Sequence, residues 1–157
     1  MILCGIDPGL SGALAFLDTE AGKLDVIDMP AVEIKRNNKT KREVSAAMLA
    51  GIIRSREVHS AIVERVGAMP GQGVSSVYAF GRSVGMIEGV LAGLMIPTDY
   101  VTPQRWQKEL GVRNGKDGSR ELAARLFPAY AAMFSRKKDD GRADAACIAY
   151  WAATQSL

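Results

Sequence analysis

The stretch that decides the fold is MILCGIDPGLSGALAFLD, residues 1–18. An apolar run, Met1–Ile6, is followed by Asp7, by a Pro-Gly-Leu-Ser-Gly segment and by a second, largely apolar run, Ala13–Asp18. Short apolar runs separated by proline and glycine are typical of two strands joined by a turn. The sequence therefore predicts two adjacent strands with an acidic residue at the end of the first.

The rest of the chain alternates between expected strands and expected helices. Further strands are predicted over Leu24–Met29, Ser60–Val66 and Ile96–Val101. Helices are predicted over Glu43–Arg56, Ser75–Leu94, Gln104–Leu110, Ser119–Phe127 and Asp140–Thr154, and residues 128–134 are left unassigned. Strands first, followed by alternating helices and strands, predict an α/β fold with a mixed sheet flanked by helices.

Composition limits the class of protein. At 157 residues, with 48% hydrophobic residues and no linker or repeat, the chain is expected to form a single domain, 1–157. Two cysteines, Cys4 and Cys147, provide no disulfide framework. The sequence has no basic leader, and its longest apolar helical stretch carries Arg82 and Glu88, so we expect a cytoplasmic protein without a membrane partner.

Four acidic residues are the candidate catalytic and metal-binding residues. Asp7 and Glu64 each end an apolar strand, and Asp140 and Asp144 lie four residues apart where a helix is expected to begin. Residues four apart share a helix face, and carboxylates are the ligands that Mg²⁺ and Mn²⁺ prefer. Two such ions about 3.5–4 Å apart can cleave a phosphodiester. The pattern indicates a nuclease with Asp7, Glu64, Asp140 and Asp144 around Mg²⁺ or Mn²⁺.

Each of these acids also has a simpler interpretation. An Asp before Pro-Gly is common in turns, a Glu can end a strand in solvent, and an Asp can cap a helix. Asp144 is the hardest to explain in this way, because it lies among alanines where an unpaired carboxylate is costly. Asp139 is an alternative to Asp140 if the helix begins one residue earlier.

Clustered cations indicate a polyanionic partner, although the net charge is only +3. One group lies within eight residues, a second surrounds the expected helix at 104–110 and the glycine-rich loop at 111–118, and a third lies just before the final acids, Asp139, Asp140 and Asp144. Cations beside metal-binding acids are suited to neutralising phosphates, although such runs are often only solvated surface. The candidate DNA-binding residues are Lys35, Arg36, Lys39, Lys41, Arg42, Arg105, Lys108, Lys116, Lys137 and Lys138.

Four segments in this order resemble the RuvC family of Holliday junction resolvases, and most closely its small phage and mobile-element members. They are Ile6-Asp7-Pro8-Gly9-Leu10-Ser11-Gly12, Val63-Glu64, Thr102-Pro103-Gln104-Arg105-Trp106-Gln107-Lys108 and Asp140-Gly141-Arg142-Ala143-Asp144-Ala145. The resemblance implies an RNase H-like fold, a homodimer, and Mg²⁺- or Mn²⁺-dependent paired nicking of four-way DNA junctions. It places Asp7, Glu64 and Asp144 at family acid positions and Lys116 near the scissile phosphate.

The sequence departs from the family pattern at two points. The family places its fourth acid three residues before the last Asp, where this chain has Gly141, so Asp140 is the expected substitute. The family also has an aromatic wedge shortly after the second acid, whereas this chain reads Gly67-Ala68-Met69. An aromatic wedge in that loop is therefore not expected, and Trp106 is expected to serve in helix packing.

Glycines recur every four residues along the expected helix at 75–94, at Gly81, Gly85, Gly89 and Gly93. Each costs up to about 1 kcal/mol relative to alanine, so a close neighbour is expected to offset them. The alanines of the last helix and a second subunit are the two candidates, and the sequence does not choose between them.

Two other functions fit parts of the sequence. A small actin-like phosphotransferase would use Asp7-Pro8-Gly9 as a phosphate-binding turn, but that class needs two such domains around a cleft. A non-catalytic junction-binding protein would use the cations, but it has no need of four acids. A junction-resolving endodeoxyribonuclease is the function that accounts for both sets of residues.

Overall fold

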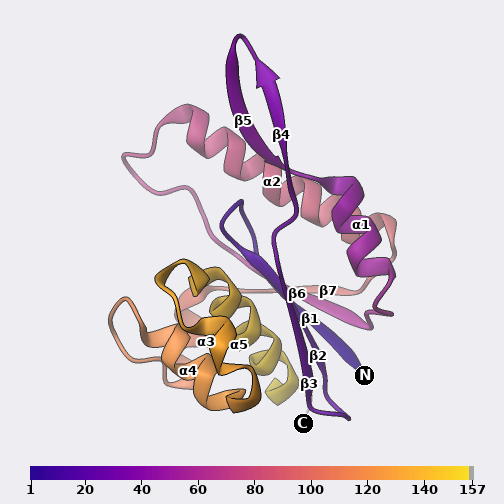
Figure 1. The fold of residues 1–157 in the computed structure, drawn as a ribbon, viewed down its shortest axis with the longest axis vertical. Helices are drawn as coiled ribbons and strands as arrows, with labels where there is room; N and C mark the ends of the chain where they lie inside the picture. The colour runs from indigo at the N-terminus through magenta and orange to yellow at the C-terminus, as the bar shows by residue number, and fades with distance from the viewer. Residues whose placement is uncertain (156–157) are drawn as a thin grey trace.

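The structure is a computed structural model that describes residues 1–155 of the chain (Figure 1). Its strands are β1 (Ile2–Asp7), β2 (Ala13–Asp18), β3 (Lys23–Asp28), β4 (Ala31–Arg36), β5 (Lys39–Val44), β6 (Ser60–Glu64) and β7 (Thr98–Val101). Its helices are α1 (Ala46–Arg54), α2 (Val74–Gly93), α3 (Pro103–Leu110), α4 (Gly118–Leu126) and α5 (Asp140–Gln155). Two 3₁₀ segments, η1 (Pro128–Phe134) and η2 (Lys137–Asp139), precede α5.

Five strands form a mixed sheet in the order β3-β2-β1-β6-β7. β2 runs antiparallel to both of its neighbours, β1 and β3. β6 is parallel to β1, and β7 is parallel to β6. Because β1 and β6 are parallel neighbours, their carboxyl ends lie at the same edge of the sheet. That edge carries Asp7 at the end of β1 and Glu64 at the end of β6.

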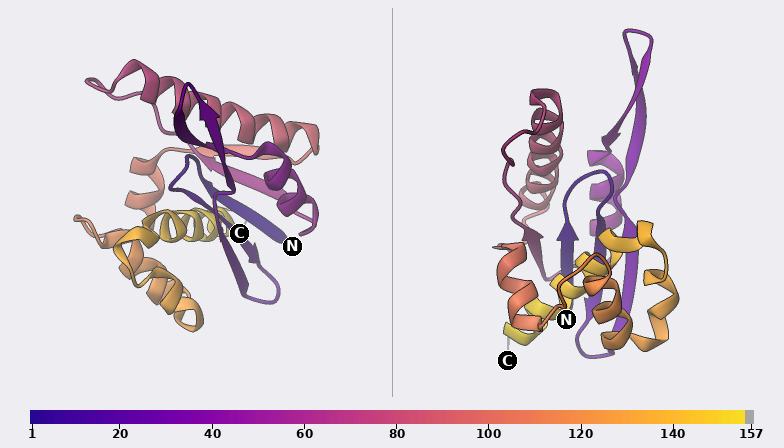
Figure 2. Two further views of the ribbon diagram at one scale, coloured as in Figure 1. Left: turned by 45° about the horizontal axis from the view of Figure 1, so that its top comes forward. Right: turned by 90° about the vertical axis from the view of Figure 1, so that its left-hand side faces the viewer.

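Helices cover both faces of this sheet, as Figures 1 and 2 show. Leu3 of β1 and Ile62 of β6 pack into the core under α3, α4 and α5, whereas Cys4 and Ile6 pack into the core under α1 and α2. Successive side chains of a strand point to opposite faces. By this alternation Asp7, like Leu3, and Glu64, like Ile62, point to the face that α5 covers.

Small residues bring α5 close to the central strand. A Cβ atom added to Gly5 of β1 would collide with the Ala145 carbonyl oxygen and the Ala149 backbone nitrogen of α5. The alanines of α5 therefore pack against the sheet. The interpretation in which they contact the glycine stripe of α2 is wrong.

The glycine stripe of α2 is instead open. Gly81, Gly85, Gly89 and Gly93 are exposed, and a Cβ atom at any of them would meet no atom within 4 Å. Ser83, Ile87 and Leu91 are the buried residues of α2, and they contact the rest of the protein from the opposite side of the helix. No segment of residues 1–155 offsets the cost of these glycines.

The main error of the sequence prediction concerns the basic stretch at 35–42 and the start of the next helix. This stretch lies in an antiparallel hairpin, β4–β5, and α1 begins only at Ala46, capped by the Ser45 side chain. Asn37 and Asn38 form the turn with φ of 49° and 56°, the conformation that two-residue hairpin turns require and asparagine tolerates. The hairpin projects beyond α2 and the main sheet (Figures 1 and 2).

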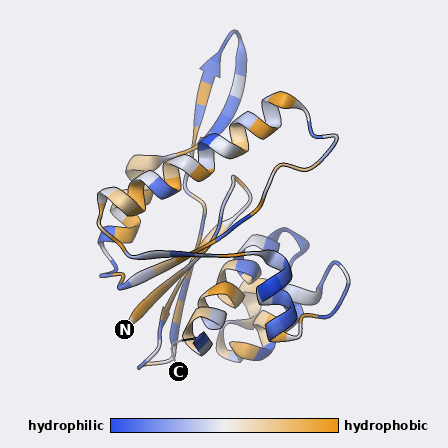
Figure 3. Cartoon of the chain, turned by 180° about the vertical axis from the view of Figure 1, so that it is seen from behind, coloured by the Kyte–Doolittle hydropathy of each residue, from blue (hydrophilic) through white to orange (hydrophobic). Residues whose placement is uncertain are grey.

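Other boundaries agree to within a few residues, and the unassigned segment 128–134 is the 3₁₀ segment η1. Figure 3 shows the projecting hairpin as largely hydrophilic, in contrast to the apolar strand β1 at the N-terminus. Within residues 1–155, no helix combines the length and the apolar character needed to cross a membrane.

Candidate active site

Three of the four predicted acids gather where β1, β6 and α5 meet. Asp7 is largely buried, and burial raises the pKa of its carboxyl well above the ordinary value, with further contributions from the nearby charges of Glu64 and Asp144. The pKa of Glu64 is raised in the same way, first by burial and then by Asp144. Mutual electrostatic effects of this kind place the three carboxyl groups within one another's field.

Glycines leave room for Asp7 between the first turn and α5. A Cβ atom added to Gly141 would lie 3.1 Å from Asp7 Oδ2 and would collide with the Ser11 carbonyl oxygen. One added to Gly12 would collide with the Asp7 carbonyl oxygen. The close approach of α5 to the Asp7 turn therefore depends on glycine at 141, whereas the conformation of the turn itself depends on glycine at 12.

Asp144 is the acid with an unsatisfied oxygen. Burial raises the pKa of Asp144 to about 6, with a smaller rise from Asp140 and a lowering by a hydrogen bond with Ser119. Its Oδ1 atom is buried and has no hydrogen-bond partner. Buried polar atoms are rarely left in this state, so Asp144 is suited to a ligand that supplies the missing partner.

Trp106 holds Glu64 in place. Its indole Nε1 donates a hydrogen bond to Glu64 Oε1 at 2.8 Å, and the ring is fully buried. This hydrogen bond lowers the Glu64 pKa and opposes the effect of burial. Trp106 packs as the sequence predicted, but its contact with a candidate ligand was missed, because Trp106 and Glu64 are 42 residues apart.

The two neighbouring aspartates, Asp139 and Asp140, have different surroundings. Asp139 is buried and accepts hydrogen bonds from the Arg136 backbone and guanidinium at 2.9–3.1 Å. Arg142 lies 3.6 Å from the same carboxylate and also forms a bidentate pair with Asp28 at the end of β3. Asp139 therefore fixes the start of α5 to the sheet.

Asp140 is half exposed and lies in an ion pair with Arg120, whose Nε atom is 2.8 Å from Asp140 Oδ1. Arg120 also pairs with Asp117. The side chain of Asp140 is thus on the side of α5 that faces α4, within the electrostatic reach of Asp144. Of the two aspartates, Asp140 is the one free of a buried structural role.

The acids do not form a preformed cage. Within residues 1–155, no three acidic, histidine or cysteine side chains are arranged as a ready metal site. The carboxylates of the site repel one another when no cation lies between them. Asp140 is instead held in an ion pair with Arg120. The residues nevertheless fit a divalent cation in their chemistry, because Asp144 Oδ1 is buried without a partner and the carboxylates of Asp7 and Glu64 lie within its electrostatic reach.

The predicted DNA-binding residues fall into two groups. Lys35, Arg36, Lys39, Lys41 and Arg42 all lie on the β4–β5 hairpin. The others lie on or near α3, α4 and η2: Arg105, Lys108, Lys116, Lys137 and Lys138. Arg105 is partly engaged within the protein, since it pairs with Glu109 at 3.1 Å and stacks on Trp151.

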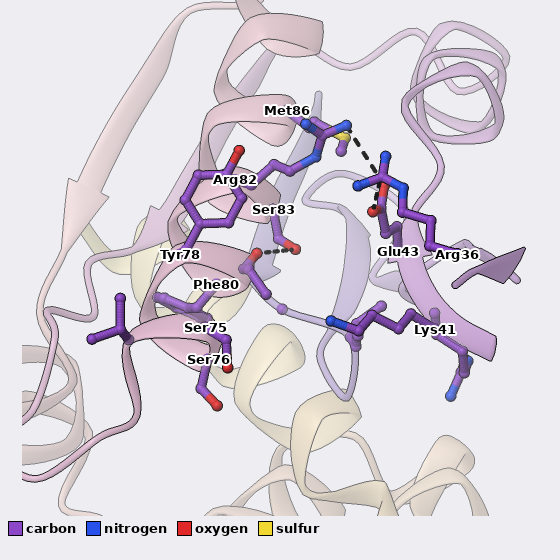
Figure 4. A pocket seen from close by; sticks show the side chains of 15 residues that line it. Arg36, Lys41, Glu43, Ser75, Ser76, Tyr78, Phe80, Arg82, Ser83 and Met86 are labelled. Carbon is purple, nitrogen blue, oxygen red and sulfur yellow. Dashed lines mark hydrogen bonds and ion pairs between the residues drawn. The ribbon is translucent and has the colours of Figure 1, made fainter. Parts of the chain in front are cut away.

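Each group comes near one part of the candidate site. Lys137 and Lys138 lie in η2, and only Asp139 separates them from Asp140 at the start of α5. A cavity of about 770 Å³ between the hairpin and α2 is lined by Arg36, Lys41 and Arg42, and also by Gly9 and Leu10 of the turn that follows Asp7 (Figure 4). The hairpin group thus reaches the turn that follows Asp7, and the second group reaches the start of α5.

Comparison with known proteins gives one sequence relative and several related folds. A chloroplastic Holliday junction resolvase, MOC1, of Chlamydomonas reinhardtii is 31% identical over an alignment that covers 86% of this chain. That alignment spans only 18% of the relative's length. No protein-family model matches the chain.

Among solved structures, T. thermophilus RuvC in complex with a Holliday junction substrate superposes with a TM-score of 0.69 at 14% identity, covering 99% of this chain and 94% of that one. The yeast mitochondrial Holliday junction resolvase Ydc2 gives a TM-score of 0.56 at 18% identity, covering 98% and 80%. The chain therefore has the fold of RuvC, and the expected RNase H-like mixed sheet flanked by helices is confirmed.

Proposed function

We propose that this protein is a metal-dependent endodeoxyribonuclease that resolves four-way DNA junctions by paired nicking. The observation that carries the proposal is the meeting of Asp7, Glu64 and Asp144 at one edge of the sheet, with the buried Oδ1 atom of Asp144 lacking a partner. The similarity to a named junction resolvase and the fold of RuvC support the choice of substrate. We propose that residues 1–157 act as one nuclease domain.

Asp7, Glu64 and Asp144 are the proposed ligands of a divalent cation, Mg²⁺ or Mn²⁺, with two ions per site. Such ions supply Lewis-acid and water-activating chemistry to phosphodiester hydrolysis. The chain's own contribution is positional: Trp106 orients Glu64, Gly141 lets α5 approach Asp7, and Gly12 allows the tight turn that follows Asp7. Asp140 is the proposed fourth ligand, and it would have to leave Arg120 in order to bind.

DNA is proposed to lie across the acids with its phosphates on the two basic groups described above. Mobile, exposed lysines and arginines bind phosphates with a strong dependence on salt. The compartment stays a prediction: both cysteines are buried and unpaired, which suits a reducing compartment such as the cytoplasm.

Paired nicking requires two active sites, and we propose a homodimer formed through the glycine stripe of α2. Four exposed glycines in one helix offer a flat surface on which a second helix can lie closely. Gly85→Leu should shift the protein from dimer to monomer in sedimentation equilibrium. Gly51→Leu is the matched control, because Gly51 is an exposed glycine within α1 that also meets no atom within 4 Å. A dimer that persists with Gly85→Leu would contradict this interface.

The function is tested with a synthetic four-way junction and a linear duplex of matched sequence, each incubated with and without Mg²⁺ or Mn²⁺. We expect symmetric nicks in the junction only, and only with metal, while Asp7→Asn binds the junction but leaves it intact. Binding without any nicking by the wild type under all metal conditions would instead indicate a non-catalytic junction-binding protein. Equal cleavage of the duplex would rule out structure-selective resolution.

A further inference from the structure

The cavity between the hairpin and α2 has two walls of different chemistry. Arg36, Lys41 and Arg42 line it from β4 and β5, and Tyr78 and Arg82 line it from α2 (Figure 4). At about 770 Å³ it lies within the range of about 300–1,000 Å³ that is common for small-ligand sites. One wall is therefore cationic, and the other carries an aromatic ring beside a cation.

Tyr78 is free to accept a planar ligand. Its side chain is 69% exposed at the mouth of the cavity, near the start of α2. Val74, one helical turn earlier, is 87% exposed and lines the same cavity. A surface that binds only phosphates has no need of exposed apolar side chains, which are costly to keep in water.

Glu43 organises the cations without neutralising them. Its carboxylate lies 3.6 Å from Arg82 of α2 and 4.0 Å from Arg36 of β4, so it links the two walls (Figure 4). Among the residues that the structure describes, Lys41 and Arg42 form no ion pair. Four cations around one carboxylate leave the cavity with a net positive charge.

The cavity also adjoins the active site. Gly9 and Leu10, which line it, follow Asp7 by two and three residues. A Cβ atom at Gly9 would lie 3.4 Å from Phe80 of α2, so the turn and the helix are in direct contact. The cavity is thus joined to Asp7 through this turn, although the Asp7 side chain itself points to the face of the sheet that α5 covers.

We propose that this cavity binds one unpaired nucleotide of the DNA, with its base stacked on Tyr78 and its phosphate on Lys41. The proposal rests on the junction-resolving function above and names the part of the substrate that this surface would recognise. A nucleotide combines an anionic group with a planar apolar one, and single-stranded nucleic acid is bound elsewhere by the same pair of features. Duplex DNA keeps its bases stacked inside and has no use for Tyr78.

A second copy of this chain fits the cavity less well. Symmetric dimers bring the same surface of both subunits together, and here that would place four arginines and lysines opposite their own copies. Like charges facing each other across an interface are unfavourable. The charge of the cavity therefore favours DNA as its occupant.

The test measures binding of Tyr78→Ala and Tyr78→Phe to three DNAs without divalent metal: a four-way junction, a matched duplex and a single strand. Loss of one stacked base should weaken junction and single-strand binding by about 5- to 150-fold for Tyr78→Ala, with no change in salt slope. Tyr78→Phe should bind like the wild type. Lys41→Ala should instead reduce the slope of log K against log salt by about 0.9.

Met95→Ala is the matched control, because Met95 is 87% exposed but does not line the cavity. Unchanged junction binding by Tyr78→Ala would overturn the proposal, and so would an equal loss for duplex and junction. A Tyr78→Ala variant that is monomeric in gel filtration while Gly85→Leu stays dimeric would also overturn it, since the cavity surface, and not the glycine stripe, would then join two copies. Nicking by the wild type with Mn²⁺, measured in parallel, tests the proposed function separately: nicking with unchanged Tyr78→Ala binding would reject only the cavity proposal.

Discussion

Asp144 on α5 and Lys41 on the β4–β5 hairpin are both charged, yet their surroundings are opposite. Asp144 lies in a small-residue environment where burial raises its pKa to about 6, whereas Lys41 lies on an exposed strand of a projecting hairpin. Burying a charge without a partner is costly, but exposing one costs nothing. The difference agrees with the proposed roles, in which the buried acids carry out phosphodiester cleavage and the exposed hairpin binds the phosphates of the DNA.

The largest expected effect is that of Asp7→Asn on nicking, and its absence would contradict the assignment of the chemistry to the buried acids. Asp7→Asn should reduce nicking by more than about 100-fold, since even outer-shell changes at metal sites cost about 10–100-fold. Junction affinity should stay near that of the wild type, because Asp7 is not a phosphate contact. Nicking rates and gel-shift titrations on the same junction measure both quantities. Wild-type nicking by this variant would remove Asp7 from the mechanism.

The second prediction separates two adjacent residues. Asp140→Asn should lose most nicking activity, because Asp140 is the proposed fourth metal ligand and lies within the electrostatic reach of Asp144. Its stability should change little, because Asp140 does not anchor α5. Asp139→Asn should keep most of its activity but lower the free energy of unfolding by about 1–3 kcal/mol, the usual cost of weakening a buried hydrogen-bonded partner. Nicking rates and thermal melts of both variants measure this. An inactive Asp139→Asn with an active Asp140→Asn would reverse the assignment.

Trp106 gives a third, smaller effect on the buried side. Trp106→Phe removes the hydrogen bond to Glu64, so the Glu64 pKa should rise further. Nicking should fall by about 10–100-fold, and the acidic limb of the pH–rate profile should move to higher pH, because Glu64 must lose its proton to bind metal.

Trp151→Phe is the matched control for this change. Trp151 donates a hydrogen bond of 2.6 Å to Glu109 and does not contact the acids. An identical shift of the pH profile in both variants would mean that a general loss of packing, not the orientation of Glu64, causes the effect of Trp106→Phe.

Junction binding by the exposed β4–β5 hairpin should depend on salt concentration. Replacing Lys35, Arg36 and Lys39 with Ala should weaken junction binding and reduce the slope of log K against log salt by about 0.9 for each lost phosphate contact. The rate of nicking at saturating protein should change little. Binding measured at several salt concentrations decides this, and an unchanged slope would mean that these three side chains only face solvent.

The sequence predicted what depends on local pattern. The alternation within β1 and β6 places Asp7 and Glu64 on one face, and the spacing of Asp140 and Asp144 follows from one helical turn. The Asn37-Asn38 pair is also a local signal for the β4–β5 hairpin, but no strands were predicted on either side of it.

The remaining features depend on packing between distant segments. Trp106 contacts Glu64, and Arg120 contacts Asp140 from 20 residues away. No sequence spacing specifies either contact, because the first depends on how α3 lies against β6 and the second on how α4 lies against α5. The openness of the glycine stripe likewise became clear only when α5 was found against the sheet.

The smallest expected effect concerns stability without metal. Asp144 has a pKa of about 6 in the folded protein against an ordinary value of 3.8. Between about pH 4 and pH 6, the Asp144 carboxyl is therefore protonated in the folded state but ionised in the unfolded state. The free energy of unfolding consequently falls as the pH rises through that window. Above pH 6 the folded protein bears the full free-energy cost of burying an ionised Asp144 carboxylate. Asp144→Asn removes that charge and with it the cost.

We therefore expect Asp144→Asn to raise the free energy of unfolding by about 1–3 kcal/mol at pH 7 without metal, and by much less near pH 4, where Asp144 is protonated in the folded protein. Each kcal/mol corresponds to about 2–4 °C in Tm for a protein of this size. Asp99→Asn, on the exposed surface of β7, is the control. Added Mg²⁺ should stabilise the wild type more than Asp144→Asn, because only the carboxylate is a strong ligand. Equal Tm values for Asp144→Asn and the wild type at pH 7 would show that burial costs this carboxylate nothing, and would remove the contrast with Lys41.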